Sequence, residues 1–208
     1  MMKIFLILIS LLEISSKSCL ILFTGGSNFI NPKLYSNFLT SINLDIYKIP
    51  FKENILNKNF YKYLENEYDD INILAHSSGC VTALNNCNPS IKKMILLDPV
   101  KTPNYNYNDL NSLEGIFILN AGKSYKWSIF PPFLPFIPAF RILDKDLNID
   151  KSKILKLTIK NYGHADIINR PWRDLMHYSR LSLGGENRTN IEFYHNLLIF
   201  FIISYLDF

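Results

Sequence analysis

The chain has 208 residues, of which 48% are hydrophobic and 19% are charged. A chain of this length can bury a substantial core as one domain, and its composition excludes an intrinsically disordered protein. The formal net charge of +4 is small and no block of basic residues is present, so we do not expect nucleic acid as a partner.

The first segment, residues 1–18, reads MMKIFLILISLLEISSKS and has two interpretations. Its lysine, apolar run and small polar residues resemble a secretory signal peptide. The same residues also suit a leading β-strand. The first interpretation implies secretion or attachment to a membrane surface and the second a cytoplasmic protein, so the location stays open.

Further along the chain, apolar runs bounded by turn residues alternate with segments of helical spacing. Strands are predicted at 20–23, 44–51, 71–77, 92–100 and 114–122, with a sixth inside 153–166 that ends near Asn161. Helices are predicted at 31–42, 55–68, 78–86, 171–178 and over the last seventeen or so residues. The first of these helices begins with Asn31 as N-cap and Pro32 at the first helical position.

This alternation predicts an α/β fold, with a mostly parallel central sheet of about six strands and helices on both faces. The apolar run near the C-terminus is about half the ~20 residues that a transmembrane helix needs, so we expect a buried terminal helix. Cys19, Cys80 and Cys87 form neither a disulfide pattern nor a metal-binding pair, and we expect all three to be small buried residues.

The carboxyl ends of parallel strands are where sites form, so residues that end the strands are the first candidates. Residues 75–79, AHSSG, leave the third strand through Ser77 and enter a helix at once. This pattern is similar to the nucleophile elbow G-x-S-x-G, in which a sharp turn exposes a serine hydroxyl. Short matches of this kind also occur by chance, so the pattern needs partners.

The partners of such a serine are a base and an acid that orients the base. Asp98 ends the next strand and His164 follows the last one, in the order serine, acid, histidine. The alternatives are that Asp98 is only a turn former and that His164 is a surface turn residue. Ser78 is a weaker nucleophile candidate than Ser77, because its flanking residues are larger.

The other histidines fit the role of base less well. His76 alternates to the opposite side of its strand from Ser77, and His177 and His195 fall in predicted helices with no partner in view. Acyl transfer also needs two backbone N–H donors for the oxyanion, and we expect these from Ser78 and from Gly26 in the Gly25–Gly26 turn. The alternative for that turn, a phosphate-binding loop, lacks the Walker spacing.

Taken together, these residues resemble the α/β-hydrolase superfamily, and within it most closely the chlorophyllase-like esterases. The resemblance is carried by AHSSGC at 75–80, LLDPV at 96–100, IFPPFLPF at 129–136 and YGHADII at 162–168, and it covers the chain from about Leu20 to the final helix. It implies one α/β-hydrolase domain over residues 19–208, reduced at its N-terminus, with Ser77 as nucleophile, Asp98 as acid and His164 as base. The elbow has alanine and cysteine where the family tends to have glycine.

Two further features accompany this resemblance. Residues 126–142 are rich in phenylalanine and proline, which suits a lid or a pocket wall and equally a loop packed on the core. Asn187 opens a glycosylation sequon that matters only in a secreted protein.

From these observations we expect a serine hydrolase that cleaves an apolar carboxylic ester without a metal or organic cofactor. The alternative is an inactive member of the fold that serves as a binding or interaction protein. A third possibility is a protein held at a membrane by its N-terminal segment, with hydrolysis secondary.

Overall fold

The computed structural model describes residues 17–25, 31–49, 56–101, 109–123, 141–169, 173 and 190–207. Most of the segment at 1–18, most of the aromatic segment at 126–142, Gly26, His177 and the sequon therefore lie outside the described residues. The helix predicted at 171–178 is described only at Arg173.

Six strands form one sheet in the order β2-β1-β3-β4-β5-β6, and every neighbouring pair is parallel. The strands are β1 (Ser18–Phe23), β2 (Asp45–Lys48), β3 (Asp70–His76), β4 (Ile91–Leu97), β5 (Gly115–Ala121) and β6 (Ile154–Ile159). The α/β class and the mostly parallel sheet are confirmed. The central strands are buried along nearly their whole length, which explains why they read as continuous apolar runs.

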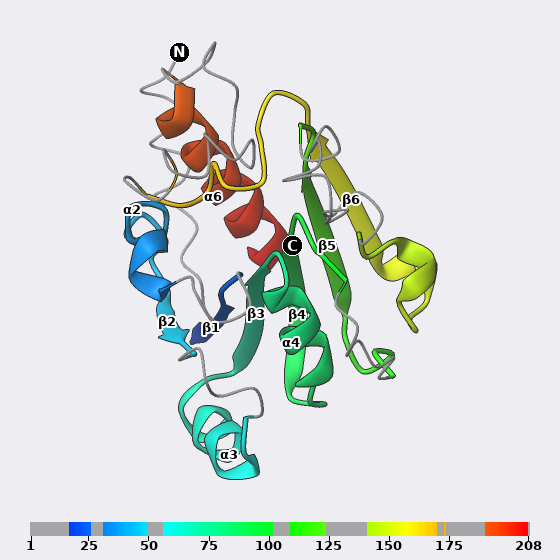
Figure 1. The fold of residues 1–208 in the computed structure, drawn as a ribbon. Coiled ribbons are helices and arrows are strands. Elements are labelled where there is room, and N and C mark those ends of the chain that lie inside the picture. The colour runs from blue at the N-terminus through cyan, green and yellow to red at the C-terminus, as the bar shows by residue number, and fades with distance from the viewer. Residues whose placement is uncertain are drawn as a thin grey trace.

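Helices cover both faces of this sheet (Figure 1). The helical elements are η1 (Pro32–Tyr35), α2 (Ser36–Leu39), α3 (Lys58–Glu67), α4 (Gly79–Asn85), η4 (Asp144–Asp146), η5 (Lys151–Lys153) and α6 (Ile191–Asp207), where η marks a 3₁₀ helix. Side chains of α3 and α4 pack on one face, and those of η1, α2 and α6 pack on the other.

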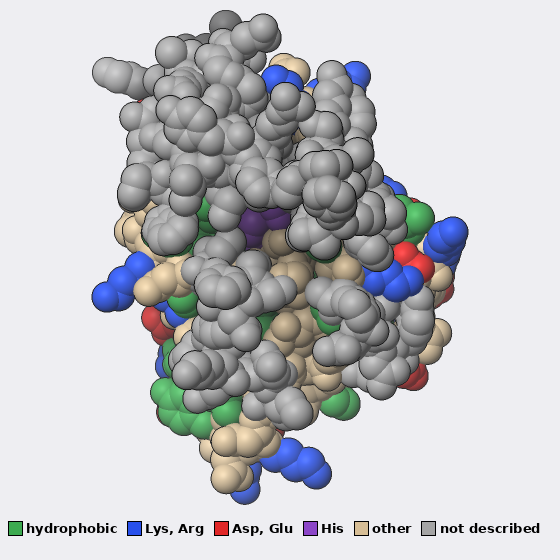
Figure 2. Space-filling view, in the orientation of Figure 1, with side chains coloured by type: hydrophobic (Ala, Val, Ile, Leu, Met, Phe, Trp, Pro, Cys, Tyr) green, Lys and Arg blue, Asp and Glu red, His purple; other side chains and the backbone are tan. Residues whose placement is uncertain are grey.

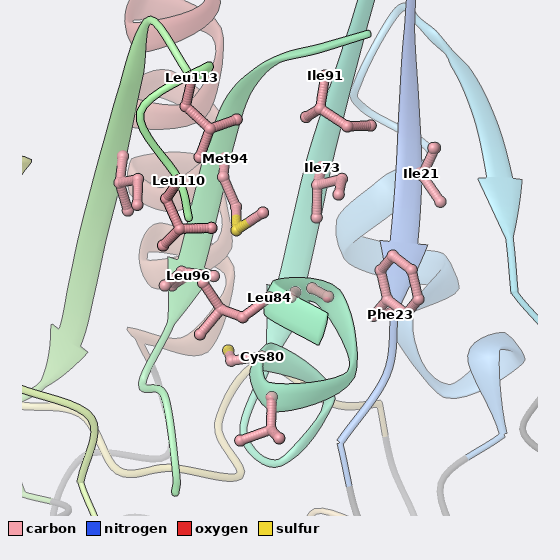
Figure 3. Close-up of a cluster of buried hydrophobic side chains, with 14 of the residues drawn as sticks. Ile21, Phe23, Ile73, Cys80, Leu84, Ile91, Met94, Leu96, Leu110 and Leu113 are labelled. Carbon is pink, nitrogen blue, oxygen red and sulfur yellow. The ribbon is translucent and has the colours of Figure 1, made fainter. Parts of the chain in front are cut away.

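Successive side chains of each strand point alternately into two hydrophobic cores, one on each face of the sheet. Ile73 and Ala75 face α3 and α4, whereas Leu74 of the same strand faces α2 and α6. Figure 3 shows the first core, in which Leu84 of α4 lies beside Leu96, with Ile73 and Met94 in the same cluster. Removing one such side chain would leave a cavity and cost about 2–5 kcal/mol.

The predicted helix at 31–42 is the main difference in secondary structure. Asn31 does cap it, accepting a hydrogen bond from the Lys33 backbone N–H at 2.9 Å, and proline follows as expected. The segment nevertheless forms a 3₁₀ turn followed by a four-residue α-helix. Its apolar face was predicted well, because Tyr35, Phe38, Leu39 and Ile42 are buried, although Leu34 is only partly covered.

The C-terminal helix α6 is buried along one side, as predicted. In the described part of the chain, no helix combines the length and the apolar character needed to cross a membrane. All three cysteines are free thiols, but Cys87 is only partly buried, because α4 ends at Asn85 and leaves it in the following turn.

The register of the sheet decides which residues meet at its carboxyl edge. His76 pairs with Leu97, and Leu97 pairs with Leu119. The next residues are held in line by backbone hydrogen bonds, from Ser77 N–H to the Leu97 carbonyl at 3.0 Å and from Asp98 N–H to the Leu119 carbonyl at 2.8 Å. Ser77 and Asp98 therefore leave adjacent strands at the same level.

Candidate active site

Ser77 occupies the turn between β3 and α4 in a backbone conformation that few side chains adopt. Its φ angle is +57°, in the left-handed region, whereas the next residue, Ser78, is already helical. A non-glycine residue costs about 1–2 kcal/mol there, so the surrounding packing must hold it. The turn places the Ser77 hydroxyl beyond the end of β3, at the carboxyl edge of the sheet.

Gly79 explains how α4 can start so close to the sheet. A Cβ atom at this position would lie 2.4 Å from the Thr24 carbonyl oxygen and 2.8 Å from the Phe23 carbonyl oxygen. Both atoms belong to the backbone at the end of β1 and cannot move cheaply. Glycine at this position therefore lets the start of α4 lie directly against the end of β1.

We predict that Gly79→Ala destabilises the protein by about 1–3 kcal/mol, as overpacking a tight site does. Alanine gains about 1 kcal/mol in helix propensity over glycine, but the contact with two carbonyl groups outweighs that gain. Urea unfolding measures the difference. Thr82→Ala in the same helix is the control and should change stability by less than about 0.5 kcal/mol. A Gly79→Ala protein as stable as the native chain would contradict this account of the turn.

The structure brings Ser77, His164 and Asp98 into one hydrogen-bonded chain. His164 Nε2 lies 2.7 Å from Ser77 Oγ, and His164 Nδ1 lies 2.5 Å from Asp98 Oδ2. The carboxylate can only accept, so in the neutral ring Nδ1 carries the proton and Nε2 accepts from the serine hydroxyl. These three side chains are also buried, with 7%, 9% and 5% exposure.

Asp98 is held by more than the histidine. Its Oδ1 accepts hydrogen bonds from the Ala121 N–H and from Arg141 Nη2, each at 3.2 Å. The same guanidinium nitrogen donates to the Ala121 carbonyl at 3.2 Å, and Arg141 pairs with Val100 in an isolated antiparallel bridge. Arg141 was missed by the sequence analysis, since nothing in its flanking residues marks it as an ion-pair partner.

The loop that carries His164 is fixed from within and from α6. Asp166 is fully buried and its Oδ2 accepts the Gly163 N–H at 2.6 Å, which closes the turn around the histidine. His195 of α6 places Nε2 2.9 Å from the Asp166 carbonyl, so this histidine does have a partner, and that partner is a backbone atom. Tyr162 stacks on Tyr194 with ring centroids 4.1 Å apart.

His76 lies beside Tyr35 and the His164 loop, and both of its ring nitrogens are occupied. Nδ1 lies 2.7 Å from the Tyr35 hydroxyl, and Nε2 lies 3.0 Å from the His164 carbonyl oxygen. Burial and the neighbouring His164 lower the pKa of His76 to about 3. It is therefore a neutral, internally bonded residue and a poor candidate for the base.

This low pKa predicts how the stability of the fold depends on pH. In the unfolded chain a histidine has a pKa of about 6.5, so between about pH 6.5 and 3 the unfolded state binds the additional proton. The free energy of unfolding should fall by about 1.4 kcal/mol for each pH unit of acidification in that window because of His76 alone. Among the neighbouring charges, His164 lowers the pKa of His76 and Asp98 raises it, while the Tyr35 hydroxyl bonds to Nδ1.

Unfolding curves of the native chain and of His76→Gln measure this contribution by difference. The difference is needed because burial also lowers the pKa of His195, which adds a slope of the same sign. We expect the substituted protein to lose less stability on acidification from about pH 6.5 to 4.5. Parallel curves would show that His76 takes up its proton equally well in the folded state.

The turn after β1 reaches the serine, although only part of it is described. A Cβ atom on Gly25 would lie 2.6 Å from the Ser77 Cβ and 3.1 Å from His76 Nδ1, so no larger residue fits there. Ser78 follows the serine directly, with its backbone N–H at the start of α4. The predicted pair of oxyanion donors, Ser78 and Gly26, stays a prediction, because Gly26 lies outside the described residues.

The three side chains of the candidate site keep only a small exposed fraction. His164 keeps 9% exposure, and Figure 2 shows histidine atoms near the centre of the face that it displays. Within the described ranges, no group of three or more histidine, cysteine or acidic residues could hold a metal ion.

Comparison with known proteins identifies no family for this chain. No protein-family model matches the sequence, and no curated protein matches it.

Proposed function

We propose that the protein is a serine hydrolase that cleaves carboxylic esters through an acyl-enzyme. The observation that carries the proposal is the unbroken chain from Ser77 Oγ through His164 to Asp98, with contacts of 2.7 and 2.5 Å. These three residues follow β3, β4 and β6, far apart in the sequence, and the fold aligns their hydroxyl, imidazole and carboxylate groups. Such an alignment activates a serine.

In this mechanism His164 Nε2 takes the proton of Ser77 as Oγ attacks the ester carbonyl carbon. Asp98 holds Nδ1–H and stabilises the imidazolium that forms, and the carbonyl oxygen becomes an oxyanion held by backbone N–H groups. The imidazolium then protonates the departing alcohol. Water, deprotonated by the same histidine, attacks the acyl group and releases the acid, which restores Ser77.

An α/β-hydrolase of the chlorophyllase-like group is the family that we propose. Its support is the order serine, acid, histidine, with the acid directly after the strand that follows the nucleophile. The small net charge and the four phenylalanines in the stretch from Trp127 to Phe140 favour an ester with an apolar acyl or alcohol group.

The test is reaction of the native protein with a fluorophosphonate probe, followed by mass spectrometry of its peptides. Ser77 Oγ would form a bond to phosphorus, fluoride would leave, and the serine proton would pass to His164. We expect one adduct, on Ser77, and none on the heat-unfolded protein. A folded native chain that does not react would favour the alternative, an inactive binding protein. An adduct on Ser78 would overturn the assignment of the nucleophile.

A further inference from the structure

A second hydrogen-bonded chain runs behind the serine, through Tyr35 and His76. The Gly25 N–H donates to the Tyr35 hydroxyl at 3.2 Å, and that hydroxyl lies 2.7 Å from His76 Nδ1. His76 Nε2 lies 3.0 Å from the His164 carbonyl oxygen. The chain therefore joins the turn after β1 to the loop after β6, two segments that are more than a hundred residues apart.

The direction of every bond in this chain follows from its two ends. A carbonyl oxygen can only accept, so His76 Nε2 must be protonated and donate a hydrogen bond to the His164 carbonyl oxygen. In the neutral ring Nδ1 then has a lone pair, and the Tyr35 hydroxyl must donate to it. The tyrosine oxygen in turn accepts from the Gly25 amide, which can only donate. One arrangement of protons satisfies all four groups.

Both ends of this chain lie against the candidate active site. The Gly25 turn approaches Ser77 closely enough to exclude a Cβ atom, and it precedes the predicted oxyanion donor Gly26. The other end is the backbone of His164, whose ring also lies with its centroid 4.7 Å from that of His76. Both connecting side chains are buried, at 0% exposure for Tyr35 and 2% for His76, so water does not compete for these bonds.

We propose that Tyr35 and His76 are positioning residues that hold the turn at Gly25 and the His164 loop at a fixed spacing around Ser77. The inference rests on the proposed function, since it assigns these residues to the same reaction. Neither side chain contacts the reacting atoms in this role. Their effect is on how often the turn and the imidazole are aligned together, and a misplacement of about 1 Å costs up to about a hundredfold in rate.

Three substitutions each remove different hydrogen bonds between Gly25, Tyr35, His76 and His164. Tyr35→Phe removes the hydroxyl and leaves the Gly25 N–H and His76 Nδ1 without partners. His76→Asn can keep an acceptor near the position of Nδ1, and His76→Gln can keep a donor near the position of Nε2. The first histidine variant thus retains the tyrosine bond and the second retains the bond to the His164 loop.

Tyr61→Phe is the matched control, because it also removes one buried hydroxyl. Tyr61 lies in α3, is 4% exposed, and donates to the Asn86 carbonyl at 2.5 Å, outside the contacts of the site. A loss of stability should therefore be similar in the two phenylalanine variants. Only the change at Tyr35 should slow the chemistry.

The experiment measures fluorophosphonate reaction rates and hydrolysis of p-nitrophenyl butyrate by the folded proteins. We expect Tyr35→Phe to lower kcat by about ten- to a hundredfold, with KM changed little. Tyr61→Phe should react at the native rate, and the two histidine variants should lie between the native chain and Tyr35→Phe. Native rates for Tyr35→Phe, or equal losses in both phenylalanine variants, would overturn the inference while leaving the proposed function intact.

A second measurement does not depend on activity. The ring ¹⁵N chemical shifts of His76 at neutral pH report which nitrogen is protonated, and we expect Nε2–H with an Nδ1 signal that moves in Tyr35→Phe. If the native protein shows this tautomer but does not react with the probe, the hydrogen-bonded chain is present, whereas the proposed function fails and the positioning role fails with it. Protonation at Nδ1 would contradict the hydrogen-bonded chain itself, whatever the activity.

Discussion

Replacing Ser77 with alanine should lower ester hydrolysis by about 10⁴- to 10⁶-fold and abolish the fluorophosphonate adduct. The acyl-enzyme cannot form without Oγ, and any remaining rate comes from bound water and the oxyanion donors. The loss should appear in kcat, with the protein still folded, because the substitution removes one small polar group and leaves β3 and α4 unchanged. Steady-state kinetics and thermal unfolding of the same preparations measure both quantities.

Ser78→Ala is the comparison that makes this result specific. It alters the adjacent serine, removes the same atom type and keeps the backbone N–H that is the predicted oxyanion donor. We expect this variant to retain the adduct and to lose less than about tenfold in rate, within the effect of a small change in position. Equal losses in the two variants would mean that damage to the turn, rather than a missing nucleophile, stops the reaction.

The three residues of the candidate site were predictable because of a property of parallel sheets. Residues that follow parallel strands emerge at one edge, so chain order and strand ends sufficed to select Ser77, Asp98 and His164. The sequence did not show whether Asp98 reaches His164 across 66 positions, and the structure places the two side chains 2.5 Å apart. The positive φ angles of Ser77 and Asp98 show that both are turn residues as well as candidates for chemistry.

The residues that support this site could not be predicted in the same way. Tyr35 and His76 act through backbone atoms of Gly25 and His164, and a hydrogen bond to a backbone group leaves no requirement on the identity of the partner. Tyr35 was recognised only as part of an apolar face. Arg141 meets Asp98 because of how the chain returns to Val100, and that path depends on loop geometry rather than on periodicity.

The second large effect on activity is expected from substituting Asp98. The backbone conformation of this residue lets the substitution separate a role in catalysis from a role in forming the turn. Asp98 has a φ angle of +43°, a conformation that asparagine tolerates better than most residues. Asp98→Asn should therefore preserve the turn and its backbone bond to Leu119 while removing the negative charge and one acceptor from His164. If Asp98 were only a turn former, the substituted protein would keep its activity.

We expect instead that Asp98→Asn lowers kcat by about 10⁴-fold. The amide can present its NH₂ group to His164, which favours the wrong tautomer, and it cannot stabilise the imidazolium. Asp144→Asn is the matched control, since it also removes one carboxylate, here an exposed one paired with Lys156 at 2.8 Å. Its kinetics should stay native.

Unfolding measurements must accompany the kinetics, because Arg141 and the Ala121 N–H both bind Asp98 Oδ1 and the substitution weakens the pair with the guanidinium. A loss of stability without a loss of kcat would show that the Asp98 carboxylate only stabilises the loop. A large loss of kcat in a protein that remains folded would assign it to the histidine, because the tautomer and charge of His164 are what the carboxylate controls. The latter outcome is the one that the 2.5 Å contact predicts.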